Sequence, residues 1–146
     1  CCHYPVGITF PEALRLADAV RKVGGDLLDR VQDGASSLPD QTWQQLVGRA
    51  CPLLINDACS VHAARPMPCR ALFSLDAVAC EDALTSDCAP PRDEAAWWRG
   101  LGAAHALLSN SSLGRRELRS AVQAILAVAD EEAAAAFAGA RAVPGA

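Results

Sequence analysis

The sequence contains seven cysteines, and three of them fall in one short stretch, CPLLINDACSVHAARPMPCR, at residues 51–70. Two more open the chain as a pair, and the last two follow at positions 80 and 88. Thiolate sulfur is a ligand for zinc, cuprous copper and iron–sulfur clusters. Prolines and an Asn-Asp turn interrupt regular backbone here, and turns allow sulfurs to converge from different directions. The pattern therefore predicts a thiolate-rich metal site.

The predicted ligands come from the start of the chain and from this stretch: Cys1, Cys2, Cys51, Cys59 and Cys69. Closing the long loop between the two groups costs only about 1.5 kcal/mol more than closing an eight-residue loop. Structural zinc binding contributes on the order of 10 kcal/mol, so loop closure does not oppose the site. Further candidates are Cys80 and Cys88, for a second ion or for none, and His62, whose C-x-x-H spacing from Cys59 a zinc site can use.

Other uses of these thiols stay open at this point. A secreted module stapled by disulfides commonly has many cysteines, but an odd number and an adjacent pair at the start fit it poorly. Single thiols such as Cys80 or Cys88 can simply be buried in a core. A catalytic nucleophile needs one thiol and a histidine, and does not account for the other cysteines.

Two arginines flank the last cysteine of the stretch and can support a metal. Four thiolates around one divalent ion leave a net charge of about −2, which guanidinium groups can offset by donating to sulfur. We expect this role for Arg65 and Arg70, with surface ion pairs to Asp57 or Asp76 as the alternative.

Composition narrows the class of protein. Hydrophobic residues make up 51% and charged residues 21%, as in a globular domain. A net charge of −4 supplies no basic surface for nucleic acid, so we expect no nucleic-acid partner. The most apolar tract, residues 120–143, carries three acidic residues, so we expect no membrane partner either. The chain does not begin with methionine and shows no signal peptide; we expect a cytoplasmic protein.

The elements that must position the cysteines are predicted to be helices. Thr9 and Glu12 form a capping box before a helix that is expected to end at Gly24-Gly25. Further helices are expected over 26–34, 40–51 (capped by Asp40), 70–88, 93–109 and 115–140. No strand pattern is evident. We expect an all-α fold, a small bundle of four to six helices around an irregular cysteine-rich metal-binding loop region. Residues 1–90 would form the cysteine-cluster region, and 91–146 a helical hairpin packed on it in one compact domain.

The segments CCHYPV, TFPEALR, CPLL and CSVHAARPMPCR resemble the YkgJ-like cysteine-cluster family, over about the first seventy to eighty residues. That family is described as chelating zinc or iron. The resemblance implies a bacterial metal-binding protein with zinc or iron, or an iron–sulfur cluster used in electron transfer or redox enzymology. It leaves open whether the metal is structural, stored, delivered or catalytic. Two family cysteines upstream of Cys1 are absent here, and His62 occupies a position where the family has tyrosine.

Overall fold

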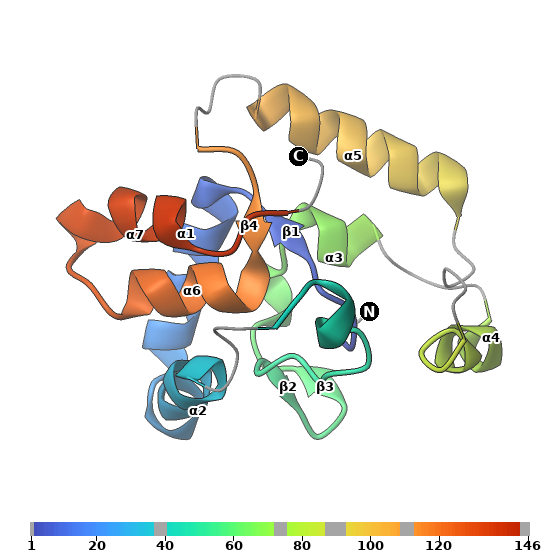
Figure 1. Ribbon diagram of the computed structural model, residues 1–146, viewed down its shortest axis with the longest axis horizontal. Coiled ribbons are helices and arrows are strands. Elements are labelled where there is room, and N and C mark those ends of the chain that lie inside the picture. The colour runs from blue at the N-terminus through green and yellow to red at the C-terminus, as the bar shows by residue number, and fades with distance from the viewer. Residues whose placement is uncertain (1, 37–40, 72–75, 87–92, 109–112, 144–146) are drawn as a thin grey trace.

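The structure is rich in helices, which confirms the helical character of the predicted all-α fold, but it also contains two small antiparallel sheets that this prediction lacked (Figure 1). The computed structural model describes residues 2–36, 41–71, 76–86, 93–108 and 113–143. Its described α-helices are α1 (Phe10–Val23), α2 (Gly25–Ser36), α3 (Met67–Ala71), α4 (Ala77–Asp82), α5 (Glu94–Leu108), α6 (Leu118–Leu126) and α7 (Ala133–Gly139). Its described strands are β1 (Gly7–Ile8), β2 (Leu54–Ile55), β3 (Ala58–Cys59) and β4 (Arg116–Glu117).

Helix α1 begins with the predicted capping box. The Thr9 hydroxyl accepts from the Glu12 backbone N–H at 3.3 Å, and the Glu12 carboxylate accepts from the Thr9 N–H at 2.9 Å. These two bonds satisfy donors that the first turn of a helix otherwise leaves unpaired. The helix ends at Gly24, whose φ of 65° is favourable for glycine and interrupts the run of helical residues, as predicted.

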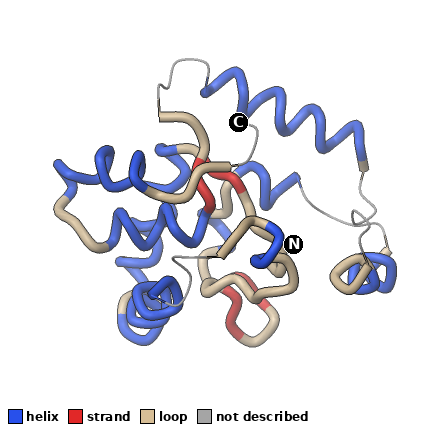
Figure 2. Tube along the Cα trace, viewed as in Figure 1, coloured by secondary structure: helices blue, strands red, loops and turns tan. Residues whose placement is uncertain are grey.

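The structure contains two strand pairs that the sequence pattern did not predict, one between distant segments and one a local hairpin (Figure 2). Strand β1 pairs antiparallel with β4, with Gly7 opposite Glu117, and thereby ties the N-terminal segment to residues near the C-terminus. Strands β2 and β3 form a hairpin whose turn residues, Asn56 and Asp57, have φ of 49° and 59°. Asn and Asp tolerate this left-handed region better than other non-glycine residues, which explains the turn.

The hydrophobic core lies between α1, α2, α6 and α7 and draws on both halves of the chain. Its fully buried side chains include Ile8, Leu16, Val31, Ile125 and Phe137. The rings of Phe10 and Phe137 pack at a tilt, with their centroids 5.4 Å apart. Residues on both sides of position 90 therefore share one core.

The predicted single helix over 115–140 is wrong, because the chain breaks after α6 and folds back as α7. A continuous helix would carry Phe137 away from the core, whereas the break buries that ring completely. Arg21 stabilises the break, since its guanidinium donates to the Ile125 carbonyl at 3.2 Å and to the Asp130 carboxylate at 3.2 Å. Tertiary packing here overrides the high helix propensity of an alanine-rich segment.

The predicted helix over 40–51 is also wrong, since its described part contains only a 3-10 turn at Gln44–Leu46. In a helix these backbone N–H groups would donate within the helix, but here two of them donate to the N-terminal segment. Gly48 donates to the His3 carbonyl at 2.8 Å, and Cys51 donates to the Cys2 carbonyl at 2.7 Å. The predicted cap, Asp40, lies outside the described residues.

Helix α5 confirms the helix predicted over 93–109 and runs along one side of the molecule, in contact with α3 (Figure 1). Helix α4 occupies part of the helix predicted over 70–88, and the Asp76 carboxylate caps it by accepting from Ala79 N–H at 3.1 Å. Within the described ranges, no helix has both the length and the apolar character needed to cross a bilayer.

Candidate metal site: a cavity lined by cysteines

Four cysteines from segments far apart in the sequence line one cavity of about 30 Å³: Cys2, Cys51, Cys59 and Cys69. A volume of this size holds one or two water-sized particles. The remaining wall is largely apolar, with Val6, Leu16 and Leu53 among the residues that form it. The structure thus brings together four of the five predicted ligands, and Cys1 lies outside the described residues.

Backbone hydrogen bonds place the first three thiols. Cys51 is held beside the N-terminal segment by its N–H bond to the Cys2 carbonyl, at 2.7 Å. Cys59 ends strand β3 opposite Leu54, so the hairpin turn sets its register. The following residue, Ser60, donates to the Leu53 carbonyl from its backbone and from its hydroxyl, both at 2.9 Å. These contacts hold residues 51–60 in a defined conformation, whereas the sequence pattern predicted an irregular loop.

Helix α3 places the fourth thiol, Cys69, and several contacts fix the turn before it. Pro66 is buried at the start of α3, and the next residue, Met67, donates its N–H to the Glu12 carboxylate at 2.7 Å. Arg70 donates to the carbonyls of Arg65 at 2.9 Å and Ala63 at 2.8 Å. Cys69 therefore depends on the N-terminus of α1 for its position.

Burial sets the protonation of two of these thiols. It raises the pKa of Cys51 to about 11 and that of Cys69 to about 12, and the neighbouring cysteines of the cavity add to both shifts. Arg119 opposes the shift at Cys51, and Arg65 opposes it at Cys69. Both thiols are consequently protonated at neutral pH, and a metal that binds them must displace their protons.

Three buried polar atoms of the cavity-lining residues are hydrogen-bond donors, and none has a partner in the described part of the chain: Tyr4 Oη, Arg65 Nε and Arg119 Nε. We call them the cavity donors. An unsatisfied buried donor costs about 1–3 kcal/mol, so such groups usually serve a purpose. Burial, followed by the influence of Cys80, raises the pKa of Tyr4, which keeps its hydroxyl protonated as a donor. Donors around sulfur atoms complement an occupant or ligand set that carries negative charge.

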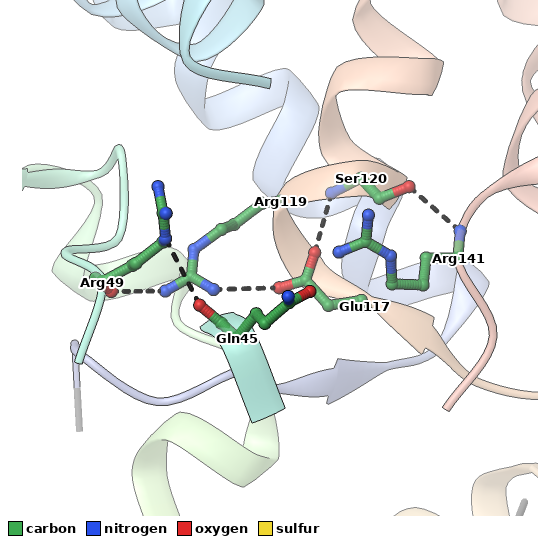
Figure 3. A network of polar contacts seen from close by, with 6 residues as sticks. All are labelled: Gln45, Arg49, Glu117, Arg119, Ser120 and Arg141. Carbon is green, nitrogen blue, oxygen red and sulfur yellow. Dashed lines mark hydrogen bonds and ion pairs between the residues drawn. The ribbon is translucent and has the colours of Figure 1, made fainter. Parts of the chain in front are cut away.

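A buried ion pair at the edge of the cavity was not predicted from the sequence. Glu117 and Arg119 are 1% and 3% exposed, and their carboxylate and guanidinium lie 3.5 Å apart (Figure 3). Arg119 also donates to the Arg49 carbonyl at 2.7 Å, and Glu117 caps α6 by accepting from the Ser120 N–H at 3.0 Å. One signal was available, because Arg119 precedes Val122 by three positions and so falls on the buried face of α6.

Of the other predicted residues that the structure describes, Arg65 lines the cavity, and His62, Arg70 and Cys80 do not. His62 is exposed, and Arg70 is exposed and holds the turn before α3 without lining the cavity. Cys80 is half-buried in α4, and Cys88 lies outside the described residues. The role of Arg65 in supporting a metal stays a prediction. Cys51, Cys59, Cys69 and Cys80 are free thiols, so these positions give no support to the disulfide-stapled alternative.

The thiols surround the cavity but do not yet converge on one point. Across the ranges that the structure describes, no three His, Cys, Asp or Glu side chains are grouped as they must be to hold a metal ion. Ligation would require the sulfur atoms to come closer together than they lie here.

Comparison with known proteins gives no match to any family model, curated protein or solved structure. The resemblance to the YkgJ-like family therefore stays a prediction.

Proposed function

We propose that this protein chelates one zinc or iron ion through the thiolates of Cys2, Cys51, Cys59 and Cys69. The observation that carries the proposal is the placement of these four residues, from three separate segments, around a single cavity. Chance burial of thiols in a core does not favour one shared cavity, whereas a metal site requires it. In this proposal the helical core supports the cysteine-bearing loops around the ion.

The chemistry of the residues fits such an ion. Sulfur donors select zinc, iron or cuprous copper over hard cations. The cavity donors supply N–H and O–H groups for thiolates that a metal would hold in the ionised form. Bringing the sulfur atoms together opposes binding only weakly, since structural zinc sites contribute on the order of 10 kcal/mol.

Four thiolates complete the coordination sphere of a tetrahedral ion, so we infer a structural or storage role in preference to hydrolysis at an open position. When bound, zinc would cross-link the three segments, and iron would add redox chemistry. The cavity of about 30 Å³ suits a single ion better than a cluster of several iron and sulfide atoms. Thiols such as those of Cys51, Cys59 and Cys69 stay reduced in a reducing compartment, so we propose a cytoplasmic location.

Elemental analysis of the protein purified without oxygen tests this proposal. We expect about one equivalent of zinc or iron per chain, with an absorption spectrum free of cluster bands if the ion is zinc. Cys59→Ser and Cys69→Ser should each remove most of the metal. Cys80→Ser is the matched control, because Cys80 is a free thiol of intermediate burial that does not line the cavity. Equal metal content in Cys69→Ser and Cys80→Ser would refute the assignment.

A further inference from the structure

We propose that Arg119 balances the negative charge of the occupied cysteine site by donating from Nε to its thiolates. This inference rests on the proposed function and extends it to a residue that the sequence pattern did not indicate. Arg119 lines the same cavity as the four cysteines but belongs to α6, which carries none of them.

The position of Arg119 is fixed on two sides. Its Nη2 donates to the Arg49 carbonyl at 2.7 Å, and its Nη1 faces the Glu117 carboxylate at 3.5 Å. Its Nε is one of the cavity donors and is buried without a hydrogen-bond partner in the described ranges. Because the guanidinium is fixed and its Nε nitrogen lacks a partner, Nε can donate to an acceptor in the cavity that Arg119 and the four cysteines line together.

Charge gives the reason for such a donor. Four thiolates and one divalent ion carry a net charge of about −2, which is costly in a buried site. Arg119 and Arg65 reach the cavity from different elements and together offset this charge. The Arg119–Glu117 contact is 3.5 Å long, whereas a strong charge-assisted hydrogen bond measures about 2.7–2.9 Å. This weak contact leaves the guanidinium able to interact with sulfur as well.

Glu117 has a complementary role in this scheme. It neutralises Arg119 when the thiols are protonated, and it holds the start of α6 by capping Ser120. The pair therefore keeps a positive charge at the cavity wall without leaving that charge alone in the metal-free protein. Removing Arg119 by itself would leave Glu117 buried without its partner and would destabilise the fold. A loss of zinc affinity in that variant could then come from unfolding as well as from the lost donor.

The test uses the full chain, with zinc ion as the probe and a chromophoric chelator as competitor. The informative variant is Glu117→Gln combined with Arg119→Met, which removes both charges and keeps similar side-chain volumes. We expect its zinc affinity to fall about 10–100-fold, and the pH at which half the zinc is released to rise. Glu117→Gln alone keeps the guanidinium and should bind zinc at least as tightly as the unmodified chain. Arg99→Met is the matched control, since Arg99 is exposed on α5, and it should leave affinity unchanged.

Urea unfolding of the metal-free variants shows whether Arg119 acts on the metal site or only stabilises the fold. In the first case zinc affinity falls by more than the loss of stability explains. A double variant that binds zinc as tightly as the unmodified chain would overturn the inference. So would a Glu117→Gln variant that loses as much affinity as the double variant. If the double variant does not fold, Arg119→Lys replaces it, with an expected several-fold loss of affinity, and unchanged affinity would again overturn the inference. An unmodified chain that binds no zinc or iron would instead refute the proposed function itself.

Discussion

Glu12 accepts a hydrogen bond from the backbone N–H of Met67 at 2.7 Å, and this bond joins the first helix to the helix that carries Cys69. The second oxygen of the same carboxylate accepts from Thr9 N–H at 2.9 Å and completes the capping box. One side chain thus both starts α1 and positions a wall of the cysteine cavity.

Replacing Glu12 with alanine should destabilise the fold and weaken metal binding together. Loss of the cap and of the bond to Met67 should lower the free energy of unfolding by about 1–3 kcal/mol. Glu12→Gln keeps an amide oxygen that can accept one of the two bonds, so its loss should be smaller. Urea unfolding and zinc titration measure both effects. Asp18→Ala is the control, because its ion pair with Lys22 is exposed; an equal loss in that variant would contradict the role given to Glu12.

The metal-free protein should become less stable as the pH rises above about 8.5, the ordinary pKa of a thiol in an unfolded chain. Burial raises the pKa of Cys51 to about 11 and that of Cys69 to about 12 in the folded state. Between these values the unfolded chain has released protons that the folded chain still holds, so stability falls with pH. Urea unfolding at pH 7.5, 9 and 10, with chelator and reductant present, measures the slope.

A variant with Cys51→Ala and Cys69→Ala supplies the comparison for this pH dependence. It should lose most of the decline between pH 8.5 and 10, because the two titrating thiols are gone. If the stability of this variant falls with pH as steeply as that of the unmodified chain, groups other than Cys51 and Cys69 cause the decline.

Truncating Phe137 should be among the most damaging changes to the core. This ring is fully buried and packs against Phe10, so Phe137→Ala should cost about 3–5 kcal/mol of stability. Trp98 is a larger aromatic residue but is 63% exposed, and Trp98→Ala should change stability by less than about 0.5 kcal/mol. Thermal or urea unfolding of the two variants gives the comparison, and similar losses would contradict the fold-back of α7.

The hairpin turn should tolerate glycine and reject branched side chains. Asp57 has a φ of 59°, a region that costs most non-glycine residues about 1–2 kcal/mol. Asp57→Gly should therefore be close to neutral, whereas Asp57→Val should destabilise the protein and disturb the register that places Cys59. Zinc content and unfolding free energy report on the two effects, and a neutral Asp57→Val would mean that this turn is not as described.

Local sequence signals predicted the parts of the fold that depend on neighbouring residues. Thr9, Glu12 and Gly24 define the ends of α1 through bonds within a few residues, and the structure confirms them. The helix predicted after residue 115 fails because Arg21 and Phe137, more than a hundred positions apart, decide where the chain turns. Propensity cannot register such contacts.

The candidate site shows the same division. The cysteines were recognisable from residue type and clustering, and four of them do share a cavity. Glu117 and Arg119 escaped notice because charged residues near the start of a helix usually face solvent. The spacing of Arg119 from Val122 was the one signal in the sequence, and the burial of the pair depends on the pairing of β1 with β4 and on the bond to the Arg49 carbonyl.

The antiparallel pairing of β1 with β4 has a consequence for biosynthesis. Strand β1 pairs with β4, so a nascent chain that stops before residue 116 lacks the partner of β1. Such a chain also lacks α6, which forms part of the cavity wall. Acquisition of an ion should therefore be a late event that follows translation of nearly the whole polypeptide. Fragments that end at residue 113 should retain little zinc. Full retention by such fragments would show that the first three-quarters of the chain forms the site without α6 and α7.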